Sequence, residues 1–237
     1  MGDMVMRSNG GAHGTEVRVW DLPTRSFHWL LVLLVGALFV TGKIGGEVMV
    51  WHARFGYAVA SLLLFRLVWG AVGGHWSRFA SFWPTYQRLD AFLRGTADRQ
   101  FMVGHSPLGG ISVFAMLGFL TLQVLSGTFS EDKAEFAGPF AALVANSTVH
   151  LATGYHKNVG QLVLVALIGL HLSAIAFYFF KRGRNLIRPM WTGNQRLEFT
   201  APHSRDDRWS RLLATMIFVA CAVTVMWVVT TAGRSDT

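Results

Sequence analysis

The sequence predicts an all-α integral membrane protein with five membrane-spanning helices. Of the 237 residues, 52% are hydrophobic and only 14% are charged, whereas a soluble domain carries about a quarter charged residues. Crossing a bilayer takes roughly 17–25 apolar residues. Five segments meet this requirement: 25–43, 52–73, 107–129, 156–180 and 209–231.

Local signals support these segments. The first follows a mixed-charge tail that lacks the pattern of a cleavable signal peptide, so we expect it to be a retained helix. In the stretch "GHSPLGG", Ser106 is suited to cap the third helix and Pro107 to begin it. The single cysteine, Cys221, lies in the fifth segment. It excludes a disulfide within the chain, and no Cys/His cluster has zinc spacing.

The distribution of basic residues predicts the orientation. Fifteen Lys and Arg residues fall in the N-terminal tail and in the 74–106 and 181–211 loops, and five lie on the opposite side. Because cytoplasmic loops collect Lys and Arg, we expect the N-terminus in the cytoplasm and the C-terminus on the outer side of the membrane. The net charge of +8 then reflects membrane topology, and we expect no nucleic-acid partner.

Four of the nine histidines lie inside the predicted spans, where ionisable groups are costly and usually functional. With this topology His28 and His171 share the inner half of the membrane, and His52 and His156 share the outer half. His156 and His171 belong to one helix and are separated by a rise of about 22 Å. Their rings leave the same broad side of that helix, one above the other.

Paired imidazoles at two depths are typical of haem ligation. Two histidines on facing helices can bind one haem iron from both sides, so the pattern predicts two haems. Gly36, Gly56 and Gly160 lie whole turns from His28, His52 and His156 on the same helix faces. There they would leave room for a flat macrocycle, although glycine also brings membrane helices together.

Other polar residues leave alternatives open. Arg66 lies fourteen residues after His52, on nearly the same side of the same predicted helix but in the inner half of the membrane. There it could bind a haem propionate or extend to the membrane surface. His150 is the alternative to His156 as the outer ligand. His105 could approach the edge of the inner haem, Gln123 is a candidate for quinone or inter-helix hydrogen bonding, and Asp21 is expected to be a loop charge.

Several stretches together resemble the bacterial cytochrome b561 family, including cytochrome b subunits of nickel–iron hydrogenases. They are "VRVWDLPTRSFHWLLVLLV", "ARFGYAVASLLLFRLVWG", "GHSPLGG" and "GLHLSA", and the resemblance covers residues 17–193. It implies two b-type haems, one bound by His28 and His171 and the other by His52 and His156. The family's two histidines on the fourth helix are usually fourteen residues apart, whereas here the spacing is fifteen. The extra residue predicts either a π-bulge or a shifted outer ligand.

From these observations we expect three parts: a cytoplasmic tail (1–24), a dihaem four-helix domain (25–193), and an amphipathic linker with the fifth membrane helix (194–237). The resemblance implies electron transfer across the bacterial inner membrane, between the quinone pool and a periplasmic redox partner such as a c-type cytochrome. A cytochrome b anchor of a hydrogenase or another dehydrogenase is the alternative, and a haem-free proton-coupled transporter is a further one. The fifth helix could hold a partner subunit or form a homodimer.

Overall fold

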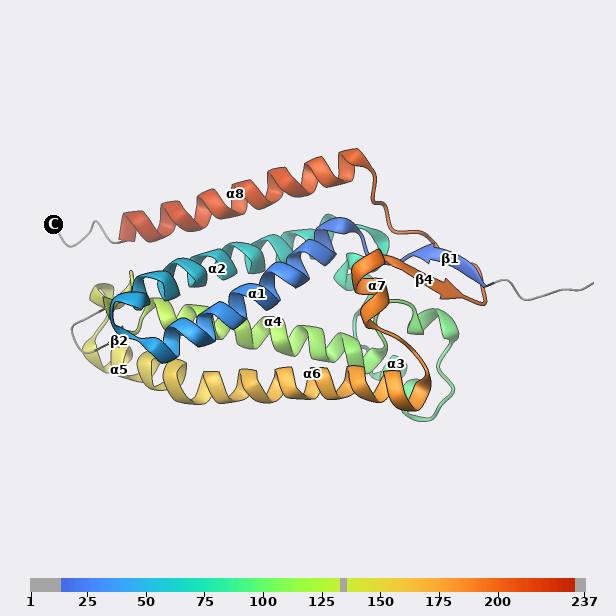
Figure 1. The fold of residues 1–237 in the computed structure, drawn as a ribbon, viewed down its shortest axis with the longest axis horizontal. Helices are drawn as coiled ribbons and strands as arrows, with labels where there is room; N and C mark the ends of the chain where they lie inside the picture. The colour runs from blue at the N-terminus through green and yellow to red at the C-terminus, as the bar shows by residue number, and fades with distance from the viewer. Residues whose placement is uncertain (1–13, 133–135, 233–237) are drawn as a thin grey trace, which may run out of the picture.

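The computed structural model describes residues 14–132 and 136–232, which form an elongated bundle of membrane-length helices (Figure 1). Five helices have the length and composition of membrane spans, so the five predicted spans are confirmed. They are α1 (Leu22–Ile44), α2 (Met49–Val72), α4 (Pro107–Thr128), α6 (Gln161–Arg182) and α8 (Arg208–Ala232). Of the predicted tail, residues 1–13 lie outside the described part of the chain.

Shorter elements connect these helices. The helices are α3 (Tyr86–Leu93), α5 (Asn146–Gly154) and α7 (Ile187–Thr192). The tight helical turns are η1 (Gly46–Val48), η2 (His75–Ser77), η3 (Phe79–Phe82), η4 (Arg99–Met102), η5 (Ala141–Leu143) and the π-turn η6 (Tyr155–Gly160). The strands are β1 (Thr15–Arg18), β2 (Glu131–Asp132), β3 (Phe136–Ala137) and β4 (Asn194–Leu197). Strand β1 pairs antiparallel with β4, and β2 with β3.

Helix α2 is the central element of the bundle. In its most apolar stretch 44% of the residues are buried, against 6–11% in the other four helices. It packs against α1, α4 and α8, and its side chains Val59, Leu63 and Phe65 belong to the two apolar clusters between the helices. The remaining helices leave most of their apolar side chains on the outside, as lipid contact requires.

The fifth helix packs on the outside of the four-helix bundle, along α2 (Figure 1). Ala214 and Cys221 are its buried contacts with the α2 side chains around Phe65. Its other face exposes large apolar groups, including Met216, Val223 and Trp227. Helix α8 therefore adds a layer to the bundle and covers part of the apolar surface of α2.

The termini of the helices follow from local chemistry. The Ser106 hydroxyl accepts the N–H of Gly109, and Pro107 occupies the first turn of α4, so the predicted cap is confirmed. Helix α6 ends where Gly183 takes a left-handed conformation, with φ of 62°, and its N–H donates to Tyr178 O. Glycine adopts this conformation without the steric cost of a side chain.

Asp21 was expected to be a loop charge, and this prediction is wrong. The residue is fully buried and caps α1 by accepting the N–H of Thr24 at 2.9 Å. Its other oxygen accepts from Trp69 Nε1 at 3.2 Å, Gly74 N at 3.1 Å and Ser77 Oγ at 2.8 Å. One carboxylate thus joins the start of α1 to the end of α2 and the turn that follows it.

A small apolar core lies beyond the spans at the same end of the bundle. Strands β1 and β4 pair from Thr15 opposite Leu197 to Arg18 opposite Asn194. This pairing buries Val17, Val19, Trp20, Trp76, Val103 and Leu197 in one cluster. The chain before α1 is thereby attached to the chain before α8, so both are ordered parts of one small unit.

Asp206 reinforces this unit from its rim. Its carboxylate pairs with Arg18 at 3.1 Å and Arg211 at 3.0 Å and accepts the N–H of Leu22. Burial alone would raise the pKa of Asp206, but the hydrogen bonds from Arg211 and Leu22 and the charges of Arg211 and Arg18 lower it below its ordinary value. The carboxylate therefore stays ionised well below neutral pH.

We expect Asp21→Ala to destabilise the protein by at least about 1–3 kcal/mol, because it leaves buried N–H and O–H donors without an acceptor. Thermal unfolding of the detergent-purified protein measures the change. Asp90→Ala is the matched control, since Asp90 forms an exposed pair with Arg94 on α3 and such pairs contribute little. Equal melting temperatures for the two variants would contradict the role of Asp21.

Candidate functional site

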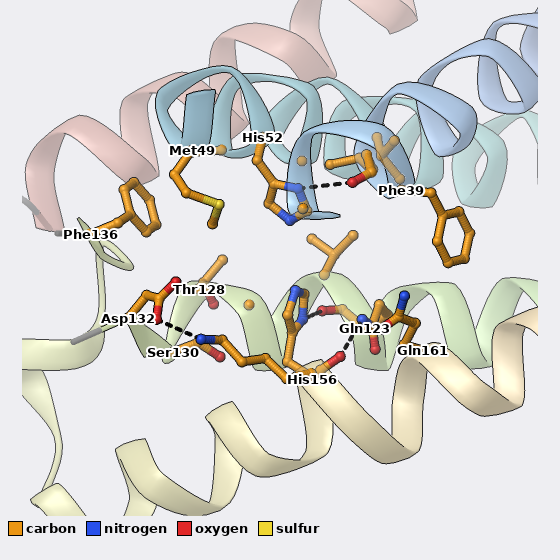
Figure 2. Close-up of a pocket in the computed structure, with 18 of the residues that line it drawn as sticks. Phe39, Met49, His52, Gln123, Thr128, Ser130, Asp132, Phe136, His156 and Gln161 are labelled. Atoms are coloured by element: carbon orange, nitrogen blue, oxygen red, sulfur yellow. Dashed lines mark hydrogen bonds and ion pairs between the residues drawn. The ribbon is translucent and has the colours of Figure 1, made fainter. Parts of the chain in front are cut away.

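A cavity of about 360 Å³ opens between α1, α2, α4 and η6 at the end of the bundle that carries β2 and β3 (Figure 2). His52 of α2 and His156 of η6 both line it. Figure 2 shows their rings extending from opposite walls toward one another. Apolar side chains such as Val35, Leu120 and Leu164 form much of the remaining wall. The structure therefore brings together the two histidines that the sequence places at the outer depth.

The spacing of the two rings fits a metal ion between them. Their centroids are 6.1 Å apart and their planes are nearly perpendicular, at 86°. Imidazole nitrogens bind metal ions at about 2.0–2.1 Å, and a ring nitrogen lies about 1.1 Å from its centroid, so two axial ligands place their centroids roughly 6 Å apart. The observed separation agrees with this value.

Hydrogen bonds orient both rings. His52 Nδ1 lies 3.1 Å from Leu38 O, and His156 Nδ1 lies 2.8 Å from Gln123 O. Because a carbonyl oxygen only accepts, each Nδ1 carries the proton and each Nε2 keeps its lone pair. Histidine ligands of metals are commonly held by such a bond from the other ring nitrogen. Both rings are thus prepared to ligate through Nε2.

The π-turn η6 explains the spacing of the histidines on the fourth span. It covers Tyr155–Gly160 and includes His156. A π-turn accommodates one residue more than an α-helix does, so the fifteen residues to His171 cover about the same helical path as fourteen. Of the two sequence alternatives, the structure contains the π-bulge. His150 lies on α5 with an exposed side chain, apart from the residues that line the cavity.

Gln123 holds the π-turn against α4. Its side-chain Nε2 donates to His156 O at 2.8 Å, while its backbone carbonyl accepts from the His156 ring. Of the two roles considered for Gln123, inter-helix hydrogen bonding is therefore confirmed. A single residue of α4 fixes both the backbone and the ring of His156.

Glycines make room around the two rings. A Cβ at Gly127 would lie 2.8 Å from Cε1 of His156, and one at Gly42 would lie 3.1 Å from Cε1 of His52. The sequence analysis missed both positions, because they lie on helices that neighbour the ligand helices. Gly36 and Gly56 face open space, as expected. The expectation for Gly160 is wrong, because its Cα packs against the Gln123 side chain.

The histidines of the inner depth lie at the opposite end of the bundle. His28 on α1 and His171 on α6 are close enough to interact electrostatically. The Nδ1 atom of His28 is buried and has no hydrogen-bond partner in the described part of the chain. This pair therefore lacks the backbone hydrogen bond that orients the rings of His52 and His156.

Arg66 lies near this second pair. Its side chain is buried, with 3% exposure, so it does not extend to the membrane surface. The guanidinium stacks on the Phe79 ring, with Cζ 4.6 Å from the centroid. Its Nη1 finds no hydrogen-bond partner within residues 14–132 and 136–232. A buried cation with a free donor requires an anionic or acceptor ligand.

Membrane-length helices with histidine rings that face one another are typical of a multi-pass membrane cytochrome. The profile of the family described as prokaryotic cytochrome b561 matches residues 19–193, which is most of the chain. The protein belongs to this family, which implies b-type haem and electron transport.

Known relatives point to the same class. The chain is 25% identical to a probable Ni/Fe-hydrogenase B-type cytochrome subunit of Bradyrhizobium diazoefficiens, over 76% of this chain and 85% of the relative. It is 30% identical to the subunit of the same description from Azotobacter vinelandii, over 67% and 80%. A probable Ni/Fe-hydrogenase 1 B-type cytochrome subunit of Escherichia coli K12 is 26% identical over 53% and 66%. No solved structure matches.

We expect Gly127→Ala to reduce the bound haem per chain, because the new Cβ displaces the His156 ring from its bond to Gln123. Pyridine haemochrome analysis of the purified protein measures the haem content. Gly118→Ala is the matched control, since Gly118 lies about two and a half turns earlier on the opposite side of the same helix and a Cβ there meets nothing within 4 Å. Equal haem loss in both variants would contradict the steric role of Gly127.

Proposed function

We propose that this protein is the haem-carrying membrane subunit that passes electrons between a dehydrogenase subunit of the hydrogenase type and the quinone pool. The observation that carries the proposal is the facing pair His52 and His156, with centroids 6.1 Å apart and both Nδ1 atoms engaged. The descriptions of the relatives favour a dehydrogenase partner over the c-type cytochrome that the sequence suggested first.

Two pairs of ligands are proposed. His52 and His156 hold an outer haem b in the cavity, and His28 and His171 hold an inner one, with Arg66 bound to a propionate of the inner group. When bound, a haem supplies one-electron iron chemistry. The protein's own residues hold the axial positions, orient the rings and set the distance between the two sites along α6.

The residues around His52 and His156 suit the outer site to electron transfer rather than to catalysis on a bound substrate. With His52 and His156 both binding a haem iron, no position would remain open for a substrate. The Nδ1 bonds to Leu38 O and Gln123 O keep the rings in place when the charge of the site changes. The apolar walls around Val35 and Leu164 limit the contact of this part of the cavity with water, and a hydrophobic surrounding of this kind influences the potential of a redox site.

The orientation follows from charge. The N-terminus and the β1–β4 unit are placed in the cytoplasm because the basic residues collect there, and the cavity then opens toward the periplasm. In this orientation His52 and His156 lie near the side where a periplasmic dehydrogenase would dock. A quinone dissolved in the bilayer would exchange electrons with the protein. The exposed face of α8 offers a surface for the partner subunit or for a second copy of the chain.

We expect two low-spin b-type haems per chain. His156→Ala removes the outer haem and His171→Ala the inner haem, whereas His150→Ala keeps both, because His150 lies outside the cavity. Haem-to-protein ratios with reduced-minus-oxidised spectra test this. A colourless wild-type protein would favour a haem-free transporter, and loss of haem in His150→Ala would reassign the outer ligand.

The choice of partner has a separate test. We expect the tagged protein, purified in mild detergent from its native membranes, to retain a metal-containing dehydrogenase subunit. We also expect hydrogen to reduce its haems, and added quinone to reoxidise them. A preparation that holds two haems but is reduced only through a c-type cytochrome would support the other electron route.

A further inference from the structure

We infer that His105 and Arg66 together form a two-donor binding pair for a carboxylate at the β1–β4 end of the bundle. The inference rests on the proposed function, because the carboxylate we assign to it is a propionate of the inner haem. His105 is then a positioning residue for that group. Its side chain is not needed for the helix cap in "GHSPLGG", which the Ser106 hydroxyl provides.

Arg66 needs an acceptor that the described residues do not supply. Asp21 is the carboxylate whose charge acts on Arg66. Both of its oxygens are already occupied by donors from Thr24, Trp69, Gly74 and Ser77. Arg66 Nη1 accordingly stays buried without a partner among the described residues. Asp21 therefore interacts with the charge of Arg66 but forms no hydrogen bond to its Nη1.

His105 is in the same situation. Its ring packs edge-on against Trp20, with centroids 4.7 Å apart, and against Phe82 at 4.4 Å. These aromatic neighbours fix the ring but offer no strong acceptor. Its Nδ1 is buried and has no hydrogen-bond partner in residues 14–132 and 136–232. His105 lies within range of the charges of both Arg66 and His171.

One aromatic platform carries both donors. Arg66 stacks on Phe79, His105 packs on Phe82, and the Phe79 and Phe82 rings touch edge to face at 6.0 Å. Gly70 allows this arrangement, because a Cβ there would overlap the Phe79 ring. The two donors are therefore held in position before any ligand binds, which reduces the entropy lost on binding.

A carboxylate is the ligand that satisfies both donors. It only accepts hydrogen bonds, it neutralises the guanidinium, and its two oxygens can serve Arg66 and His105 at once. A haem ligated by His171 carries such groups on its edge. A quinone headgroup also has acceptor oxygens, but it carries no negative charge to pair with the Arg66 guanidinium. We therefore assign the pair to the propionate.

Infrared redox-difference spectra of the purified holoprotein, with ¹³C in the haem propionate carboxyl groups, test the assignment. We expect His105→Leu and Arg66→Gln to shift the labelled carboxylate bands and to lower the midpoint potential of the inner haem. His105→Asn should keep the wild-type bands, because its amide N–H can replace the donor at Nδ1.

Two matched controls accompany these variants. His75→Leu removes a histidine with a comparable edge-on contact to tryptophan, at 4.7 Å from Trp76. Arg88→Gln removes an arginine stacked on Phe101 at 4.7 Å. Both should leave the labelled bands unchanged, because neither residue belongs to the pair.

The outcomes separate this inference from the proposed function. A wild-type protein without two haems would remove the basis of both. Two haems with labelled bands that do not move in His105→Leu and Arg66→Gln would overturn the inference and the propionate role of Arg66, while the proposed histidine ligands and electron transfer would stand. Unmoved bands together with weaker binding of a quinone analogue would assign the two donors to a quinone oxygen, which also overturns it.

Discussion

The arrangement of this protein depends on how it satisfies polar groups where no water is available. In a bilayer each buried N–H and C=O needs a partner inside the protein. His52 and His156 meet this requirement by donating Nδ1–H to backbone carbonyls of neighbouring helices. The bonds leave both Nε2 atoms facing the same cavity. The hydrogen bond at Nδ1 of each ring therefore orients its Nε2 toward a shared ligand.

The same requirement explains two features at the helix ends. The π-turn at Tyr155–Gly160 interrupts the regular helical hydrogen bonds, and Gln123 supplies a side-chain donor to the carbonyl of His156. At the other end, Asp21 accepts from donors that the ends of α1 and α2 would otherwise leave unpaired. These two residues connect adjacent helices and so determine where the histidines stand relative to one another.

The sequence analysis succeeded where a property belongs to one segment. The five spans and the cap at Ser106 are each visible in a single stretch, because length, apolar composition and turn chemistry are local, and the extra residue before His171 is visible by comparison with the family's usual spacing. It failed where the partner lies far away in the chain. From the sequence Asp21 is expected to be an acidic loop residue, because its partners Trp69 and Gly74 lie about fifty residues away. An aspartate two residues before Pro23 is nevertheless a helix-cap signal.

By itself the sequence determined that the chain crosses the membrane five times and that its histidines fall at two depths, because hydrophobicity and helical rise depend only on the order of residues. Only the tertiary structure decided which atoms meet. The contact of Gly127 with His156 and of Gly160 with Gln123, and the burial of Arg66, depend on how helices rotate and pack against one another. Such packing depends on several segments at once, so it cannot be predicted from any one of them.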